Sequence, residues 1–386
     1  MRLLRLGIPA LLLCGQLFAT LIPGPNLAKR IETADSIVVG KVVRGTIRTS
    51  GGQVSNDLVL HIDRVLKGGL IPATDIDAHL EGRGVFMVPT PSESAIPQQI
   101  YGIWFLNSAS HPYIVISRDG QIGELYMAPV VMPEGAPAGR PGATPAASVA
   151  NEMVSAMSWL GAPGSSSSDK KVAAENLSKL RSLSEDFRSL ERAVTLPAYR
   201  QFVLEKSLPL RAIGIQGLIS ADDPEGVTRA AAEWTELSSA AAVFPISSSL
   251  MSYSNTDPGG VRALAALALR EDPEPSLRQN AVYALRAIHT KEALPALIAL
   301  LDDQSERVRP YALSGLCLFV RNGPAVTPQS VPSMSWLQSR QPAPFLTPEA
   351  ERYCSLGGTI DSTKVDAYVS FWKSWWSEHR AEIESH

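Results

Sequence analysis

Cysteine and histidine are scarce in this chain, which has 3 cysteines and 6 histidines among its 386 residues. Three cysteines are too few for a disulfide-dense scaffold or for a zinc site with four thiolate ligands. Positive charge is not in excess either, because 35 lysines and arginines face 38 aspartates and glutamates, for a formal net charge of −3. Without a general basic field, the chain is not expected to bind nucleic acid.

Recognisable catalytic motifs are also missing. The sequence contains no His-Glu-x-x-His, Gly-x-Ser-x-Gly, Cys-x-x-Cys or P-loop motif. One Ser-x-x-Lys match ends at Lys170 in a serine-rich stretch, where a lysine is not desolvated enough to act as a base, and we attribute it to chance. The only residues considered as metal ligands have no diagnostic spacing; they are His61, His79, Asp75 and Asp77. We predict no metal, no cofactor and no enzymatic activity.

Hydrophobic sequence is plentiful, and it predicts a folded chain. Hydrophobic residues make up 45% and charged residues 19%, which argues against wholesale disorder. At about 100–200 residues per domain, this length predicts two or three domains.

The N-terminus has the build of a secretory signal peptide. Arg2 and Arg5 precede an apolar run that ends before the turn-forming Pro23-Gly24-Pro25. We expect cleavage near Ala19, which would leave a formal net charge of −5 and place the protein in the periplasm or outside the cell. The alternative is an uncleaved membrane anchor, because residues 6–22 approach the length of a membrane span. We expect the protein to associate with a membrane only if this segment is an uncleaved anchor.

Strand patterns follow the signal segment. Residues 36–43 are rich in β-branched side chains, and residues 57–66 alternate apolar with polar at their centre. Further strands are expected at residues 99–106, 113–117 and 122–131. The phrase at residues 34–42, with Arg64-Val65-Leu66-Lys67-Gly68, resembles bacterial secreted domains of the OB-like, tissue-inhibitor-of-metalloproteinase-like kind. The N-terminal cysteines of the animal inhibitors are absent, so protease inhibition is not implied.

The middle of the chain changes from a β pattern to a helical one. Proline, glycine, alanine and serine dominate residues 132–170, which predicts a linker, with one short helix at 149–160. From about Lys171 the hydrophobic period becomes 3.6. Positions in the helix from Leu277 to Ile288 match those from Val308 to Phe319 at an offset of 31 residues. Two matching helices of this kind indicate a repeat that must stack to bury its apolar stripe.

The segments at residues 293–303 and 307–313 resemble a HEAT repeat, and residues 210–218 form a weaker echo. In that family an aspartate after the first helix and an arginine that opens the second form a ladder between repeats. The resemblance implies that Asp302 and Arg309 do so here, with Asp272 and Arg278 one unit earlier. It also implies an extended surface for a protein partner. Some HEAT-like proteins resemble phycobilin lyases, so the alternative function is a lyase-type enzyme or an enzyme accessory. Lyases of that kind act on cytoplasmic pigments, and an export signal speaks against this alternative.

The C-terminal region combines a proline-rich loop with an aromatic helix. Its tryptophans, Trp372, Trp375 and Trp376, lie on one side of that helix, which is either a patch that binds a partner or a cap over the last repeat. Cys317 and Cys354 flank the loop at a separation of 37 residues. They are either a disulfide or a buried thiol and a free one, and the sequence leaves both readings open.

The sequence therefore predicts an α+β multidomain fold, with an N-terminal antiparallel β domain like an OB barrel and an α-helical solenoid of HEAT-like repeats. We expect an exported, non-catalytic scaffold that binds a polypeptide. The predicted segments are a signal peptide at 1–20, the β domain at 21–131, the linker at 132–170, the repeats at 171–321, and the loop and capping helix at 322–386.

Overall fold

The computed structural model describes most of the chain beyond the N-terminal segment. The described residues are 27–50, 53–81, 100–106, 130–162, 170–241, 244–270, 275–288, 290–305, 307–321, 345–354 and 364–385. The predicted signal peptide, the strand expected at 113–117 and most of the proline-rich loop lie outside them. No helix within the described ranges is long and apolar enough to cross a membrane.

The N-terminal part is a five-stranded antiparallel sheet, as the sequence predicts. Its order is β3-β2-β1-β4-β5. The fourth strand returns beside the first, which is a Greek-key arrangement, the class to which the OB fold belongs. The strands are β1 (Ser36–Ser50), β2 (Gln53–Lys67), β3 (Thr74–Glu81), β4 (Tyr101–Leu106) and β5 (Val130–Val131).

A glycine allows the paired strands β1 and β2 to lie close together. A Cβ added at Gly40 would lie 2.1 Å from the carbonyl oxygen of His61, so a larger residue does not fit there. The carbonyl of Gly40 accepts a hydrogen bond of 3.0 Å from the buried indole of Trp104 on β4. Both contacts hold the centre of the sheet around β1.

The segment predicted as a linker is attached to the protein along its described length. Residues 132–144 run beside α2 (Pro145–Gly161), and the side chains of Asn151 and Ser155 donate hydrogen bonds to the carbonyls of Arg140 and Pro137. From the same helix, Glu152 forms a two-point ion pair with Arg64 of β2, with distances of 3.0 and 2.8 Å. Residues 132–162 are therefore not the free tether that their composition predicts, because long-range contacts fix them.

A short helix that the sequence did not predict makes a second connection between the sheet and the helices. It is α1 (Leu27–Thr33). The Arg30 guanidinium lies 4.4 Å from the ring centre of Phe105 on β4, and burial lowers the pKa of Arg30 to about 10, against the attraction of Asp186. The backbone N–H of Leu27 donates to Ser189 Oγ at 3.2 Å. The sheet is thus docked on the first helices.

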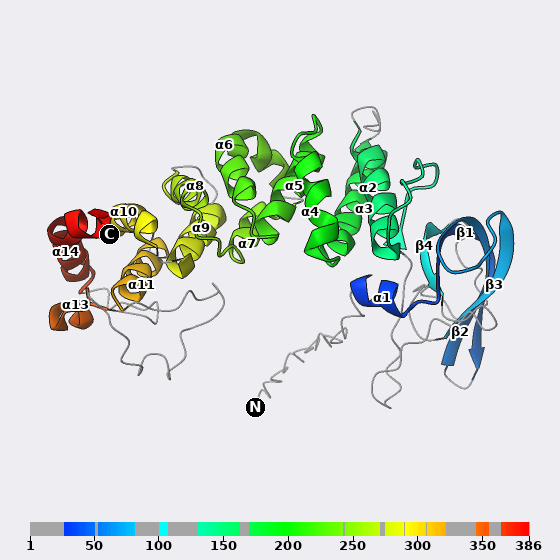
Figure 1. Cartoon of the computed structure of the whole chain (residues 1–386), viewed down its shortest axis with the longest axis horizontal. Coiled ribbons are helices and arrows are strands. Elements are labelled where there is room, and N and C mark those ends of the chain that lie inside the picture. Colours follow the sequence, from blue (N-terminus) through cyan, green and yellow to red (C-terminus); the bar gives the residue numbers. More distant parts are fainter. Residues whose placement is uncertain are drawn as a thin grey trace, which may run out of the picture.

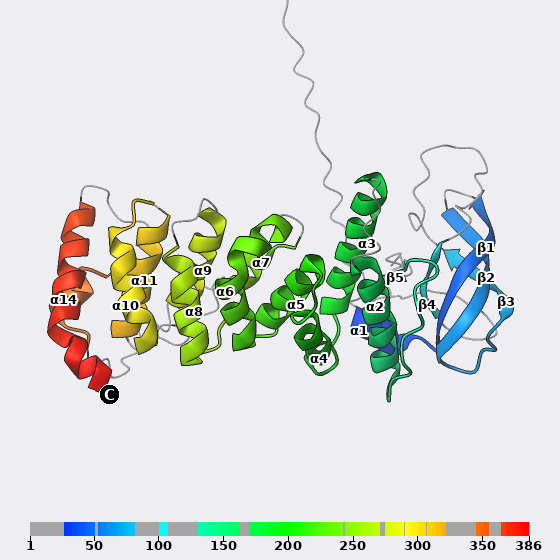
Figure 2. The same cartoon turned by 90° about the horizontal axis from the view of Figure 1, so that it is seen from above.

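The rest of the chain is a helical solenoid that extends away from the sheet (Figure 1, Figure 2). Its early helices are α3 (Lys170–Arg188), α4 (Arg192–Phe202), α5 (Leu208–Ser220), α6 (Pro224–Ala241) and α7 (Ile246–Leu250). Its later elements are α8 (Pro258–Ala268), α9 (Pro275–Ile288), η1 (Lys291–Ala293), α10 (Leu294–Ala299), η2 (Leu300–Asp302), α11 (Val308–Val320), α13 (Pro348–Arg352) and α14 (Val365–Ser385).

The helices stack in two rows, which confirms the predicted repeat. Figure 1 shows α6, α8 and α10 along one edge and α7, α9 and α11 along the other. Among the positions matched at an offset of 31 residues, three apolar pairs are buried on both α9 and α11: Leu277 and Val308, Ala281 and Ala312, and Leu285 and Leu316. The weaker repeat match at residues 210–218 falls on the buried helix α5. In the row of α7, α9 and α11, helix α7 is shortened to five residues.

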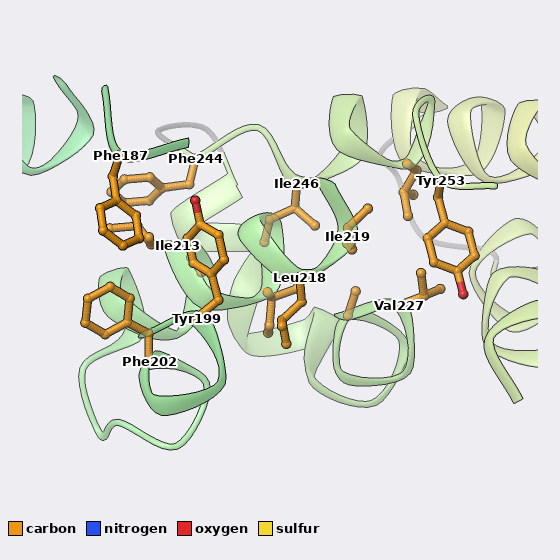
Figure 3. Close-up of a cluster of buried hydrophobic side chains, with 14 of the residues drawn as sticks. Phe187, Tyr199, Phe202, Ile213, Leu218, Ile219, Val227, Phe244, Ile246 and Tyr253 are labelled. Atoms are coloured by element: carbon orange, nitrogen blue, oxygen red, sulfur yellow. The ribbon is translucent and has the colours of Figure 1, made fainter. Parts of the chain in front are cut away.

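The core of the solenoid is continuous between neighbouring helix pairs. Figure 3 shows side chains from α3 to the loop after α7 packed in one cluster, among them Phe187, Tyr199, Ile219 and Tyr253. Phe187 and Tyr199 meet edge to face, with ring centres 5.4 Å apart. A Cβ on Gly217 would lie 2.3 Å from the Tyr199 ring, so this glycine lets α4 pack closely on α5. The apolar stripe of each helix pair is thereby buried against the neighbouring pair.

Candidate interaction surface

The loops between repeats are held by an ion pair that crosses from one repeat to the next. Arg278, on α9, pairs with the Asp303 carboxylate after η2 and donates to the carbonyl of Ala268 at the end of α8. Asp303 also accepts the backbone N–H of Ser305 at 2.8 Å. Asp303 therefore stabilises its own turn and also binds the neighbouring repeat, which fixes the spacing of the helices.

A turn with the same local hydrogen bond and an ion pair occurs earlier in the solenoid. Asp223 accepts the backbone N–H of Glu225 at 3.0 Å and pairs with Arg200 of α4 at 2.8 Å. In both turns the second of two consecutive aspartates carries the ion pair and caps the residue two positions later. The pair of Arg278 and Asp303 joins one repeat to the next, whereas Arg200 and Asp223 join the adjacent helices α4 and α5.

The residues of the ladder differ in part from those that the resemblance implied. Arg278 does take part, but its partner is Asp303, because the turn directs this second aspartate inward. Asp302 instead pairs with Lys373 of α14, with distances of 2.5 and 2.6 Å. The described part of the chain shows no ion pair for Arg309, and Asp272 lies outside that part.

A cluster of two tyrosines and an arginine lies on the row of α9 and α11. The rings of Tyr283 and Tyr311 meet at an angle of 62° with centres 4.3 Å apart. The guanidinium of Arg286 lies 4.4 Å from the centre of the first ring and 5.5 Å from the second. Burial and the hydrogen bond with Tyr283 raise the pKa of the Tyr311 hydroxyl, so it keeps its proton at neutral pH. The geometry holds both rings in place.

Amide side chains extend this tyrosine cluster into a larger face. Gln279 hydrogen-bonds to Tyr311, and Asn280 donates to the carbonyl of Ser247 at 3.0 Å. Both tyrosines and both amides remain partly exposed. We call these four residues the α9–α11 face; Arg286, which is 8% exposed, lies buried against the two rings. The rings of this face offer apolar area, and its hydroxyl and amide groups can pair with a polypeptide backbone.

The three tryptophans of the last helix do not form a contact surface. Trp372 is 0%, Trp375 3% and Trp376 9% exposed. Trp372 donates to the carbonyl of Tyr353 at 3.1 Å, and Trp375 packs edge to face on Phe345. The partner-binding interpretation of these residues is therefore wrong, and the capping interpretation is the one that their burial supports.

The four residues considered for a metal lie on two neighbouring strands, with His61 on β2 and Asp75, Asp77 and His79 on β3. His61 Nδ1 lies 2.6 Å from a carboxylate oxygen of Asp75, and His61 Nε2 lies 3.9 Å from Asp63. Asp57 is opposite His79 in the same ladder. Among the described residues there is no group of three or more histidine, cysteine, aspartate or glutamate side chains that could hold a metal ion.

A hollow of about 490 Å³ lies between the end of α2, α3 and the start of α5. Its lining is mostly apolar, with Leu160, Leu177 and Leu208 among the contributors and Lys206 as the charged residue. The described residues that line it include no acid, histidine or cysteine. The hollow offers space without a recognisable catalytic pair.

By its fold, the chain is a helical-repeat protein with an antiparallel β domain. Residues 261–318, which span α8 to α11, match the family model of HEAT repeats. The helical region therefore contains HEAT repeats. No curated protein matches the chain, and no solved structure matches it.

Sequence reasoning missed the α9–α11 face, although part of the signal was present. Tyr283 and Tyr311 each lie in a helix whose repeat was recognised, but they are not at matching positions of the repeat. The rings nevertheless meet across the boundary between the two repeats. Aromatic residues at the less buried positions of repeated helices are the feature that could have indicated it.

Proposed function

We propose that this protein is an exported, non-catalytic scaffold that binds a polypeptide partner through its helical solenoid. HEAT repeats generally mediate contacts between proteins and are typically non-catalytic. The observation that carries the proposal is the partly exposed α9–α11 face, because tyrosine is favoured where binding energy is concentrated. An extended row of helices also suits an extended partner better than a small substrate.

The two tyrosines of the face provide the test. We expect the full chain carrying Tyr283→Ala and Tyr311→Ala to bind its partner about tenfold more weakly or worse. The measurement is affinity capture with tagged full-length protein from the periplasmic or secreted fraction, followed by titration of the recovered partner.

The matched control is Leu269→Ser at the end of α8, where the side chain is 46% exposed in the other row of helices. This control should retain the partner. Melting temperatures of both variants show whether each is folded. Equal binding by the folded tyrosine variant and the wild type would count against this face.

Export is the second part of the proposal, and it rests on Arg2, Arg5 and the apolar run that follows them. The chain isolated from cells should begin near residue 20 and be recovered outside the cytoplasm. N-terminal sequencing of the fractionated protein measures this directly. A soluble cytoplasmic product that still begins at Met1 would exclude it.

A further inference from the structure

Two cysteines far apart in sequence meet where the last repeat contacts the C-terminal cap. Cys317 is fully buried on α11, and Cys354 follows α13 at a half-buried position. Their thiols share a hydrogen bond, and Cys317 Sγ lies 4.0 Å from the carbonyl oxygen of Tyr353. Both are thiols in this structure. The contact therefore exists in the reduced protein without any bond between the sulfurs.

The surroundings of Cys354 favour its thiolate. The hydrogen bond with Cys317 lowers the pKa of the Cys354 thiol, burial opposes that shift, and Arg321 lowers the pKa further by a hydrogen bond and by its charge. Arg321, just after α11, is itself held by an ion pair of 3.3 Å with Glu351 of α13. A stabilised thiolate beside a buried second thiol is the arrangement in which one cysteine attacks and the other resolves.

The residue next to Cys354 contacts the C-terminal helix α14. Tyr353, adjacent to Cys354, accepts the indole N–H of Trp372 and stacks on Phe371 with ring centres 4.4 Å apart. These rings belong to α14, which covers the last repeat. A bond between the cysteines would therefore fasten both α13 and α14 to α11.

We propose that Cys317 and Cys354 are a redox-active pair, and that their disulfide locks the C-terminal cap onto the last repeat. The oxidant is a disulfide of the thiol–disulfide exchange class, such as glutathione disulfide or an oxidoreductase. This modification site is independent of the proposed partner binding.

The exchange takes place in two steps. The Cys354 thiolate attacks one sulfur of the oxidant, forms a mixed disulfide, and releases the other sulfur as a thiolate. Cys317 then gives up its proton to solvent and attacks Cys354 Sγ, which closes the internal disulfide and releases the second thiolate. The two cysteines together lose two electrons and two protons, and the oxidant's disulfide is reduced to two thiols.

The experiment uses the full-length chain equilibrated in glutathione buffers of increasing oxidised fraction. We expect an internal disulfide, seen as a loss of two mass units and as protection of Cys317 and Cys354 from alkylation after denaturation, with peptide mapping to separate them from Cys14. The oxidised protein should melt roughly 5 °C higher than the reduced one, because the bond closes a 37-residue separation. Two free thiols, or glutathione retained on Cys354 without the internal bond, would overturn the proposal.

A pair of arginine variants tests the role of Arg321. In the reduced protein, Cys354 should be alkylated faster than Cys317, and Arg321→Gln should slow the reaction of Cys354 several-fold. Arg352→Gln is the matched control, because Arg352 is exposed and lies two residues from Cys354. If both variants react like the wild type, Arg321 does not activate Cys354 and that part of the proposal is wrong.

Discussion

Replacing Leu316 with aspartate is expected to unfold the helical solenoid. Leu316 is 0% exposed and lies on α11 among stacked repeats. The variant loses a buried leucine and places a carboxylate where no partner is available, which together should cost more than about 4 kcal/mol of unfolding free energy. Because each repeat is stabilised by its neighbours, the loss should spread beyond α11. Far-UV circular dichroism during urea and thermal unfolding measures the effect.

The control for Leu316→Asp is the same substitution at a leucine in solvent. Leu204, after α4, is 71% exposed, so Leu204→Asp should change stability by less than about 0.5 kcal/mol. A Leu316→Asp protein that keeps the wild-type melting temperature would contradict the stacked-repeat structure.

The second large effect is expected at the ion pair between the sheet and α2. Arg64→Ala leaves the carboxylate of Glu152, which is 2% exposed, without its two-point partner. Breaking a buried pair on one side should cost about 3 kcal/mol, since the remaining charge is buried alone. Urea unfolding followed by far-UV circular dichroism should show this loss.

Two further variants define what the loss means. Arg64→Met with Glu152→Leu removes both charges and should recover much of the stability. Lys41→Met breaks the exposed pair with Glu134, at 3.1 Å, and should change stability by about 1 kcal/mol or less. If Arg64→Ala is no worse than Lys41→Met, the contact between sheet and helices is not stabilising.

The repeats could be predicted because their signal is local. The spacing of buried residues on α9 recurs on α11, and a stripe that one helix pair cannot bury implies stacking whatever the neighbours are. Strand β1 was equally clear from its β-branched residues. Strand β3 was not predicted, although Ile76 and Ala78 alternate with Asp75 and Asp77 as a strand requires.

Contacts between distant residues were not predictable in the same way. Nothing in the composition of residues 132–170 shows that Glu152 faces Arg64, and such pairing turned an expected tether into a docked segment. The resemblance implied Asp302 for the ladder, and the structure instead pairs Asp303 with Arg278, because the turn at Asp303 decides which of the two aspartates points inward. The pattern of the tryptophans fitted a cap and a binding patch equally, and only their burial separates the two.

The proposed binding role is tested most directly by mapping where the partner touches the solenoid. A photo-crosslinking residue is placed in the full-length protein at Gln279, on the α9–α11 face, and in a second preparation at the exposed Glu236 of α6. The account predicts a reproducible crosslink to one polypeptide from position 279, lost when Tyr311→Ala is added, and little from position 236. Crosslinking that is equal at both positions, or unchanged by Tyr311→Ala, would contradict it.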